Sequence, residues 1–87
     1  MGYRFNVTKK AQKDLQKLDE KQSKTIIKKL LWYAKQNNPL LYSIKMQDSK
    51  TGDIRFRVGD HRAIAVIDED KSIILIVKID HRKQVYR

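Results

Sequence analysis

The chain of 87 residues contains no cysteine, so it has no disulfide framework and no thiolate ligand for a metal. Its two histidines alone are too few to build a closed zinc site. No apolar stretch approaches the roughly 20 residues of a membrane span, and the N-terminus lacks the apolar run of a signal peptide. We therefore expect a cytoplasmic protein with no cofactor, no metal and no membrane partner.

Proline and glycine are also scarce, with one and three residues, and the chain has no repeat, low-complexity run or Gly/Ser linker. A length of 87 residues is enough for one compact core and too short for two. We therefore expect a single domain over residues 1–87.

Acidic residues are few compared with basic ones: Lys and Arg number 20 against 10 Asp and Glu, giving a formal net charge of +10. Such an excess costs self-repulsion in a small fold, and a common reason for it is a polyanionic partner such as nucleic acid. An anionic membrane surface is the weaker alternative, because the apolar helical stripes are needed to cover a sheet. Part of the lysine content serves as an ordinary solvated surface.

The first half of the chain predicts a strand and then a helix. Tyr3, Phe5 and Val7 alternate with polar residues, which is the period of a half-buried strand. Thr8 then offers an N-cap to a short amphipathic helix. The apolar positions of this helix are Ala11, Leu15 and Leu18.

A second helix is expected to follow directly. Asp19 and Gln22 resemble a capping box that starts it, and Asn37-Asn38-Pro39 stop it. We expect its buried stripe to consist of Ile27, Leu30, Leu31 and Ala34. The two helices form a hairpin whose apolar stripes need a flat surface to cover.

The second half predicts three strands joined by short turns. Ile54, Phe56 and Val58 alternate with Arg55 and Arg57, and Gly59-Asp60 supplies turn chemistry. The next strands run over 61–67 and 72–79, with a polar turn at 68–71. The apolar run at 73–77 predicts a central strand buried on both faces.

These elements predict an α+β fold in the order β-α-α-β-β-β. A small antiparallel sheet is covered on one face by the helical hairpin, and the N-terminal strand joins the three-strand meander at an edge or in the interior. The other face stays open. The period of two turns Arg55 and Arg57 toward that open face, where paired guanidinium groups match phosphate oxygens.

The C-terminal segment at 80–87 combines a histidine, a tyrosine and several cations. If it docks beside the sheet, Tyr86 stacks on an unpaired base while His81 and Arg82 reach its phosphate. The alternative is an ordinary edge strand capped by charges.

The segments RFRVGDHRAIAVID and KIDHRKQVYR resemble the paired signatures of the RelE toxin family, and the opening YRFNVTKKAQKDLQKLD resembles the family's first strand and helix. The resemblance spans the chain. It implies two helices on a small antiparallel sheet, and a bacterial or archaeal toxin that is paired with an antitoxin and cleaves messenger RNA in the ribosomal A site.

The resemblance also implies roles for individual residues. Arg62 matches an arginine that stabilises the phosphate in the transition state, Arg82 one implicated in stabilisation or proton transfer, and Tyr86 a tyrosine that orients the nucleotide. We expect Arg62 and Arg82 on the open face, where their truncation leaves the fold intact. The remaining RNA-binding candidates are Lys45, Arg55, Arg57, Lys83 and Arg87. Asp53 stands where some relatives have a lysine implicated in deprotonating the nucleophile, which leaves the general base open.

The chemistry fits such a site, because RNA carries its own nucleophile in the 2′-hydroxyl and needs no metal for in-line cleavage. Positioning and charge stabilisation supply much of the rate, and a histidine suits proton transfer near neutral pH. His81 is the candidate, whereas His61 is expected at the surface. Two other functions stay open: a non-catalytic RNA- or ribosome-binding regulator, and a ParE-like toxin that acts on DNA gyrase.

Overall fold

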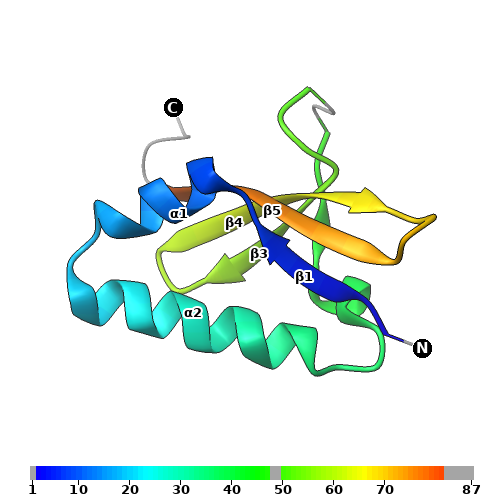
Figure 1. The fold of residues 1–87 in the computed structure, drawn as a ribbon, viewed down its shortest axis with the longest axis horizontal. Coiled ribbons are helices and arrows are strands. Elements are labelled where there is room, and N and C mark those ends of the chain that lie inside the picture. Colours follow the sequence, from blue (N-terminus) through cyan, green and yellow to red (C-terminus); the bar gives the residue numbers. More distant parts are fainter. Residues whose placement is uncertain (1, 48–49, 82–87) are drawn as a thin grey trace.

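A computed structural model describes residues 2–47 and 50–81 as two helices packed on one face of a sheet (Figure 1). The elements are β1 (Arg4–Val7), α1 (Lys9–Gln16), α2 (Glu20–Ala34), the 3-10 helix η1 (Pro39–Tyr42), β2 (Ile44–Lys45), β3 (Ile54–Val58), β4 (His61–Asp68) and β5 (Ile73–His81). This confirms the expected α+β class, with η1 and β2 as additional elements. No described helix has the length and apolar character needed to cross a bilayer.

The sheet has the strand order β1-β5-β4-β3-β2. The strands β3, β4 and β5 pair antiparallel, as expected, and β2 pairs antiparallel with β3, but β1 lies at the edge and runs parallel to β5. The sheet is therefore mixed and not wholly antiparallel. Period-two alternation reports which face a residue occupies and carries no information about strand direction, so the sequence pattern could not distinguish the two arrangements.

The predicted starts of both helices are confirmed by their caps, whereas α1 ends before Leu18 and α2 ends before Asn37. The Thr8 hydroxyl accepts the Ala11 N–H at 3.1 Å, and the Asp19 carboxylate accepts the Gln22 N–H at 2.8 Å. After α2 ends, the Asn38 side chain accepts the Leu40 N–H at 3.2 Å, and Pro39 begins η1. Each short polar side chain satisfies a backbone donor that has no partner inside its helix.

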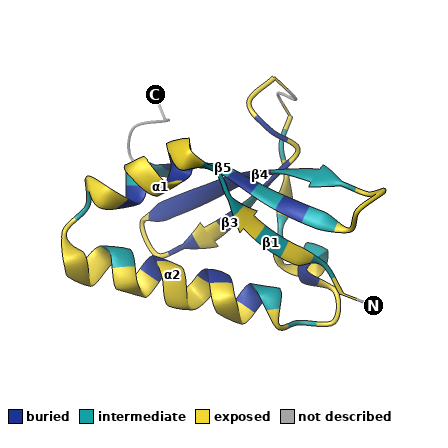
Figure 2. Cartoon of the chain, viewed as in Figure 1, coloured by how far each residue is buried: buried dark blue, intermediate teal, exposed yellow. Residues whose placement is uncertain are grey.

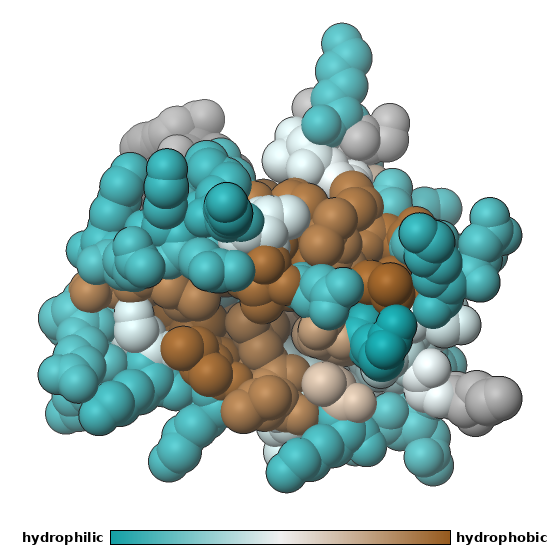
Figure 3. All heavy atoms as spheres, in the orientation of Figure 1, coloured by the Kyte–Doolittle hydropathy of each residue, from teal (hydrophilic) through white to brown (hydrophobic). Residues whose placement is uncertain are grey.

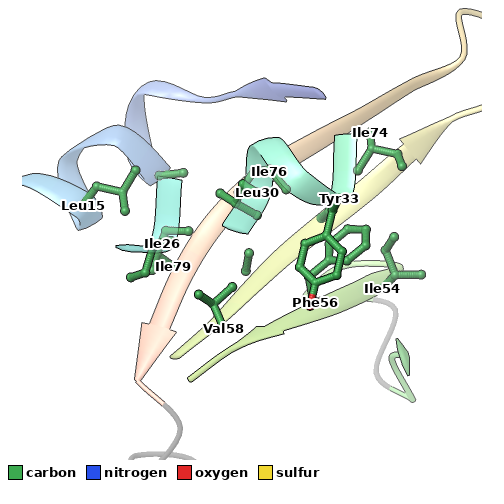
Figure 4. Close-up of a cluster of buried hydrophobic side chains, with 13 residues drawn as sticks. Leu15, Ile26, Leu30, Tyr33, Ile54, Phe56, Val58, Ile74, Ile76 and Ile79 are labelled. Atoms are coloured by element: carbon green, nitrogen blue, oxygen red, sulfur yellow. The ribbon is translucent and has the colours of Figure 1, made fainter. Parts of the chain in front are cut away.

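The core lies between the helices and the sheet (Figure 4). Phe56 and Ile76 are fully buried at its centre, and burial follows every second residue of β3 (Figure 2). Tyr33 of α2 packs its ring 4.8 Å from that of Phe56 and donates its hydroxyl to the Arg57 carbonyl at 2.8 Å. This hydrogen bond lets a large side chain with a polar end occupy the core.

The buried stripe of α2 differs from the expected one. Ile26, Leu30 and Tyr33 face the sheet, while Ile27 and Leu31 are 45% and 57% exposed. Of the predicted stripe, only Leu30 is buried. The stripe through Ile27 and Leu31 contains only apolar residues, so it was preferred over the stripe that includes Tyr33. The sequence does not show that the Tyr33 hydroxyl can donate to a carbonyl across the core.

The central strand is β4 and not β5. Residues 61–65 of β4 are all buried, whereas β5 alternates between buried and half-buried positions. On the face away from the helices, Ile64 is covered by Gly52, which lies so close that a Cβ there would meet the Ile64 side chain. The strand with the long apolar run, β5, therefore lies between the edge strand β1 and the central strand β4.

Candidate nucleic-acid interface

Two arginines of β3 lie on the face away from the helices, as expected. The alternating burial of β3 places Ile54, Phe56 and Val58 in the core and leaves Arg55 half-buried and Arg57 exposed. We call the surface on the side of Arg55 and Arg57 the open face. Directly opposed residues of neighbouring strands share a face, so the strand register extends this surface across the sheet.

A row of charged residues crosses three strands on the open face. Arg57 of β3 is opposite Arg62 of β4, and Arg62 is opposite Asp80 of β5. Two residues back along the strands, Arg55 is opposite Ile64, which in turn is opposite Lys78. Sequence reasoning missed Lys78 and Asp80 as members of this surface. The pairing of β4 with β5 shifts register here, because Ile64 is opposite Lys78 but Ala65 is opposite Ile76. The period of two set by Ile74 and Ile76 therefore changes face before Lys78, and the sequence alone could not show this shift.

Arg62 lies on the expected face but is not exposed. Its side chain is only 9% exposed, and one guanidinium nitrogen lies 3.7 Å from the carboxylate of Asp80, whose side chain is 16% exposed. The reason is that β4 is the central strand, so its neighbours on both sides bury the guanidinium. A buried cation needs an anionic partner, and Asp80 supplies one.

Lys45 does not share the face of Arg55. In the pairing of β2 with β3, Lys45 is opposite Ile54, and Ile44 is opposite Arg55. Lys45 is therefore an exposed residue at the edge of the sheet on the helical side. This placement could not be predicted, because β2 has only two residues, too few for a period to be recognised.

The two histidines lie on the helical side, away from the arginine row. His61 and His81 are opposite each other in register, next to Val58, and their rings meet edge to face with centroids 4.7 Å apart. His61 is buried and not at the surface as expected, and its Nε2 has no hydrogen-bond partner among the described residues. Burial lowers the pKa of His61, and the nearby His81 lowers it further against a smaller opposite effect of Asp60 and Asp80.

Asp53 is tied to the backbone of β4. Its carboxylate accepts the Ile67 N–H at 2.9 Å, and its own N–H donates to the Ala65 carbonyl at 2.9 Å. This side chain therefore extends the pairing of β3 with β4 beyond the end of the strand. In the described part of the chain, no group of three or more histidines and carboxylates could hold a metal. The remaining site candidates, Arg82, Lys83, Tyr86 and Arg87, lie outside the described residues.

Comparison with known proteins places these features in a family. Residues 5–86 match the family model described as the ParE toxin of type II toxin-antitoxin systems, parDE. A search among curated proteins finds no significant match.

Solved structures share the fold. The toxin-antitoxin complex RelBE2 from Mycobacterium tuberculosis contains a chain with 23% identity and a TM-score of 0.80, over 94% of this chain and 100% of that one. A chain of the archaeal RelE-RelB complex from Pyrococcus horikoshii OT3 has 24% identity and a TM-score of 0.73, over 98% and 100%. The family match confirms the resemblance to the toxins at the level of the superfamily. The chain belongs to the ParE toxin family of type II toxin-antitoxin systems, within the RelE/ParE superfamily.

Proposed function

We propose that this toxin is an endoribonuclease, an mRNA interferase that binds and cuts messenger RNA on its open face in the ribosomal A site. The observation that carries the proposal is the row formed by Arg57, Arg62 and Asp80, with Arg55 and Lys78 beside it. Guanidinium groups from neighbouring strands present planar donors to phosphate oxygens. A net charge of +10 adds long-range attraction to RNA.

The roles follow from the placement of each side chain. Arg57 is exposed and is the residue that meets the phosphate first, whereas Arg62, beside it on β4 and paired with Asp80, stabilises the charge that develops on the phosphorane. Fixing a guanidinium before the substrate arrives removes the cost of ordering it during the reaction. Arg82 and Tyr86, from the segment outside the described residues, are proposed to complete the site by charge stabilisation and base stacking.

The test is to map the ends of transcripts by primer extension after brief induction, and to repeat the assay with purified protein on translating ribosomes. We expect new 5′ ends within codons of translated messages. Intact transcripts under both conditions, with translation still arrested, would contradict the ribonuclease and favour a non-catalytic ribosome-binding regulator.

A protein target is the second candidate, and the match to a ParE family model favours it. A ParE-like toxin inhibits DNA gyrase by contact and needs no cluster for phosphate chemistry. Supercoiling by purified gyrase in the presence of the toxin distinguishes the two functions. Loss of supercoiling without any transcript cleavage identifies the gyrase inhibitor.

The partner that neutralises the toxin is proposed to be an antitoxin with an acidic amphipathic segment. Apolar side chains gather between α1 and α2 with hydrophilic ones around them (Figure 3). An apolar groove at this place is lined by Phe5, Val7, Leu15, Ile27, Leu30, Leu31, Ala34 and Ile76. Lys24 and Lys35 are exposed one turn before Ile27 and one turn after Leu31, so the groove favours a helix that is apolar on one side and acidic at its edges.

A further inference from the structure

The arginine row of the open face ends in a carboxylate. Asp80 is opposite Arg62 in register, and its Oδ2 lies 3.7 Å from the Nη2 of Arg62. The Asp80 side chain is 16% exposed, so it is held in place while part of it still reaches solvent. We propose that Asp80 is the general base that takes the proton from the attacking 2′-hydroxyl of RNA. This role rests on the ribonuclease activity proposed above.

A carboxylate is an unfavourable group on a surface that only binds RNA, because it repels the phosphates. A general base, in contrast, has to be a proton acceptor within hydrogen-bond reach of the 2′-hydroxyl beside the held phosphate. Neighbouring strands lie about 4.8 Å apart, so the row from Arg57 to Asp80 spans roughly 10 Å. A phosphate held between Arg57 and Arg62 therefore brings its ribose next to Asp80.

Three other candidates for proton transfer are placed differently, and Lys78, which shares the open face, is opposite Ile64 in the neighbouring row. His81 lies on the helical side of the sheet against His61, and Lys45 lies opposite Ile54 on that same side. The Asp53 carboxylate is occupied by the Ile67 N–H. Asp80 is the one of these groups that shares both the face and the row of Arg62.

The reaction balances with water as the only other reactant. The O–H bond of the 2′-hydroxyl breaks and its proton passes to the Asp80 carboxylate while the O2′–P bond forms. The bond between phosphorus and O5′ of the next nucleotide breaks, and O5′ takes a proton from water. The products are a 2′,3′-cyclic phosphate and a 5′-hydroxyl, and Asp80 returns its proton to solvent. Arg57 and Arg62 stabilise the phosphorane charge throughout.

The test compares the wild type with Asp80→Asn and Asp80→Glu in single-turnover cleavage on programmed ribosomes over a range of pH. Asp68→Asn is the matched control, because Asp68 is opposite Ile73 at the far end of the same strand pair. Affinity is measured separately with a 2′-deoxy message, which lacks the nucleophile. We expect Asp80→Asn to cleave about 100- to 10,000-fold more slowly and to bind at least as tightly as the wild type. The acidic limb of the pH-rate profile, which is the fall in cleavage rate toward low pH, should disappear in Asp80→Asn. The control Asp68→Asn should cleave as the wild type does.

Asp80→Asn cleaving within severalfold of the wild type would overturn the proposal. So would a cleavage defect matched by an equal loss of binding with the acidic limb retained, since Asp80 would then only hold Arg62 in place. If Asp80→Asn does not fold, Asp80→Glu carries the test: it should lose at least tenfold in rate and keep the acidic limb, and full activity would overturn the proposal. A wild type that leaves all messages intact rejects the ribonuclease function itself, which is a separate result.

Discussion

At the scale of single residues, burial decides what a substitution at Arg62 measures. Replacing Arg62 by Ala leaves the Asp80 carboxylate without its 3.7 Å partner in a mostly buried position. Removing one member of a buried ion pair costs about 3 kcal/mol. We therefore expect Arg62→Ala to lower the urea midpoint as well as activity, contrary to the sequence-based expectation of an intact fold. An unchanged midpoint would show that the pair contributes no stability.

Arg57 offers the cleaner probe of RNA binding because it is exposed. Arg57→Ala should leave the free energy of unfolding within about 0.5 kcal/mol of the wild type. Losing one phosphate contact should reduce the slope of log affinity against log salt by about 1. Lys24→Ala, which removes an exposed cation from α2 on the opposite side, serves as the control and should leave the slope unchanged. Equal slopes for the wild type and Arg57→Ala would remove Arg57 from the interface.

His61 should make stability depend on pH. Its pKa in the folded protein lies below the ordinary value of 6.5, mainly through burial. The unfolded chain therefore binds a proton first as the pH falls below 6.5, and stability declines until the folded pKa is reached. We expect His61→Gln to reduce this decline, measured as urea midpoints between pH 7.5 and pH 5 in steps of about half a unit. Parallel curves for the two proteins would assign the pH dependence to other groups.

At the scale of elements, one carboxylate fastens α1 to the sheet. Asp14 accepts the Ile79 N–H of β5 at 3.0 Å and the Lys10 ammonium at 2.7 Å. Burial opposes the ionisation of Asp14, but the hydrogen bonds from Lys10 and Ile79 together with the charges of Lys10 and Lys17 outweigh it, so its pKa lies below the ordinary value of 3.8. The contribution of this group to stability is therefore complete at neutral pH and is lost as the pH falls below 3.8.

The expected consequence is that Asp14→Ala destabilises the protein by about 1–3 kcal/mol at pH 7, because the Ile79 N–H loses its acceptor. Hydrogen exchange should become faster at Ile79 and its neighbours before it changes in β3. Lys10→Ala is the control, since it removes the exposed partner and keeps the acceptor. A similar loss in both variants would assign the effect to the ion pair and not to the link between α1 and β5.

How far the elements could be predicted depends on whether local sequence determines them. The caps at Thr8 and Asp19 and the alternation in β3 are local features, and they predicted the starts of the helices and the faces of β3 correctly. The parallel pairing of β1, the choice of β4 as the centre and the burial of Arg62 depend on partners far away in the chain. His81 was assigned to the site because it is adjacent in sequence to other candidate residues. Successive residues of a strand point to opposite faces of the sheet, so His81 lies on the other face from Asp80.

At the scale of the whole molecule, the apolar groove and the open face lie on opposite sides of the sheet. Binding of the antitoxin in the groove and toxicity should therefore be separable by mutation. We expect Leu31→Glu, at a position 57% exposed, to abolish rescue by the proposed antitoxin while growth arrest persists. Leu41→Glu, at a position 77% exposed outside the groove lining, is the matched control and should retain rescue. Co-purification measures complex formation directly, and a Leu31→Glu toxin that still copurifies would place the antitoxin elsewhere.

The parallel pairing of β1 with β5 has a consequence for synthesis. Arg4 is opposite Ile73, so the first strand waits for the last described strand before it has a partner in the sheet. Contacts so distant in sequence form late in folding. In a nascent chain that is still emerging from the ribosome, the sheet is therefore incomplete. Arg62 has no Asp80 beside it until β5 has emerged. The order of synthesis thus delays assembly of the charged row until nearly the whole chain has been made, and an antitoxin already present in the cell can meet the toxin at that moment.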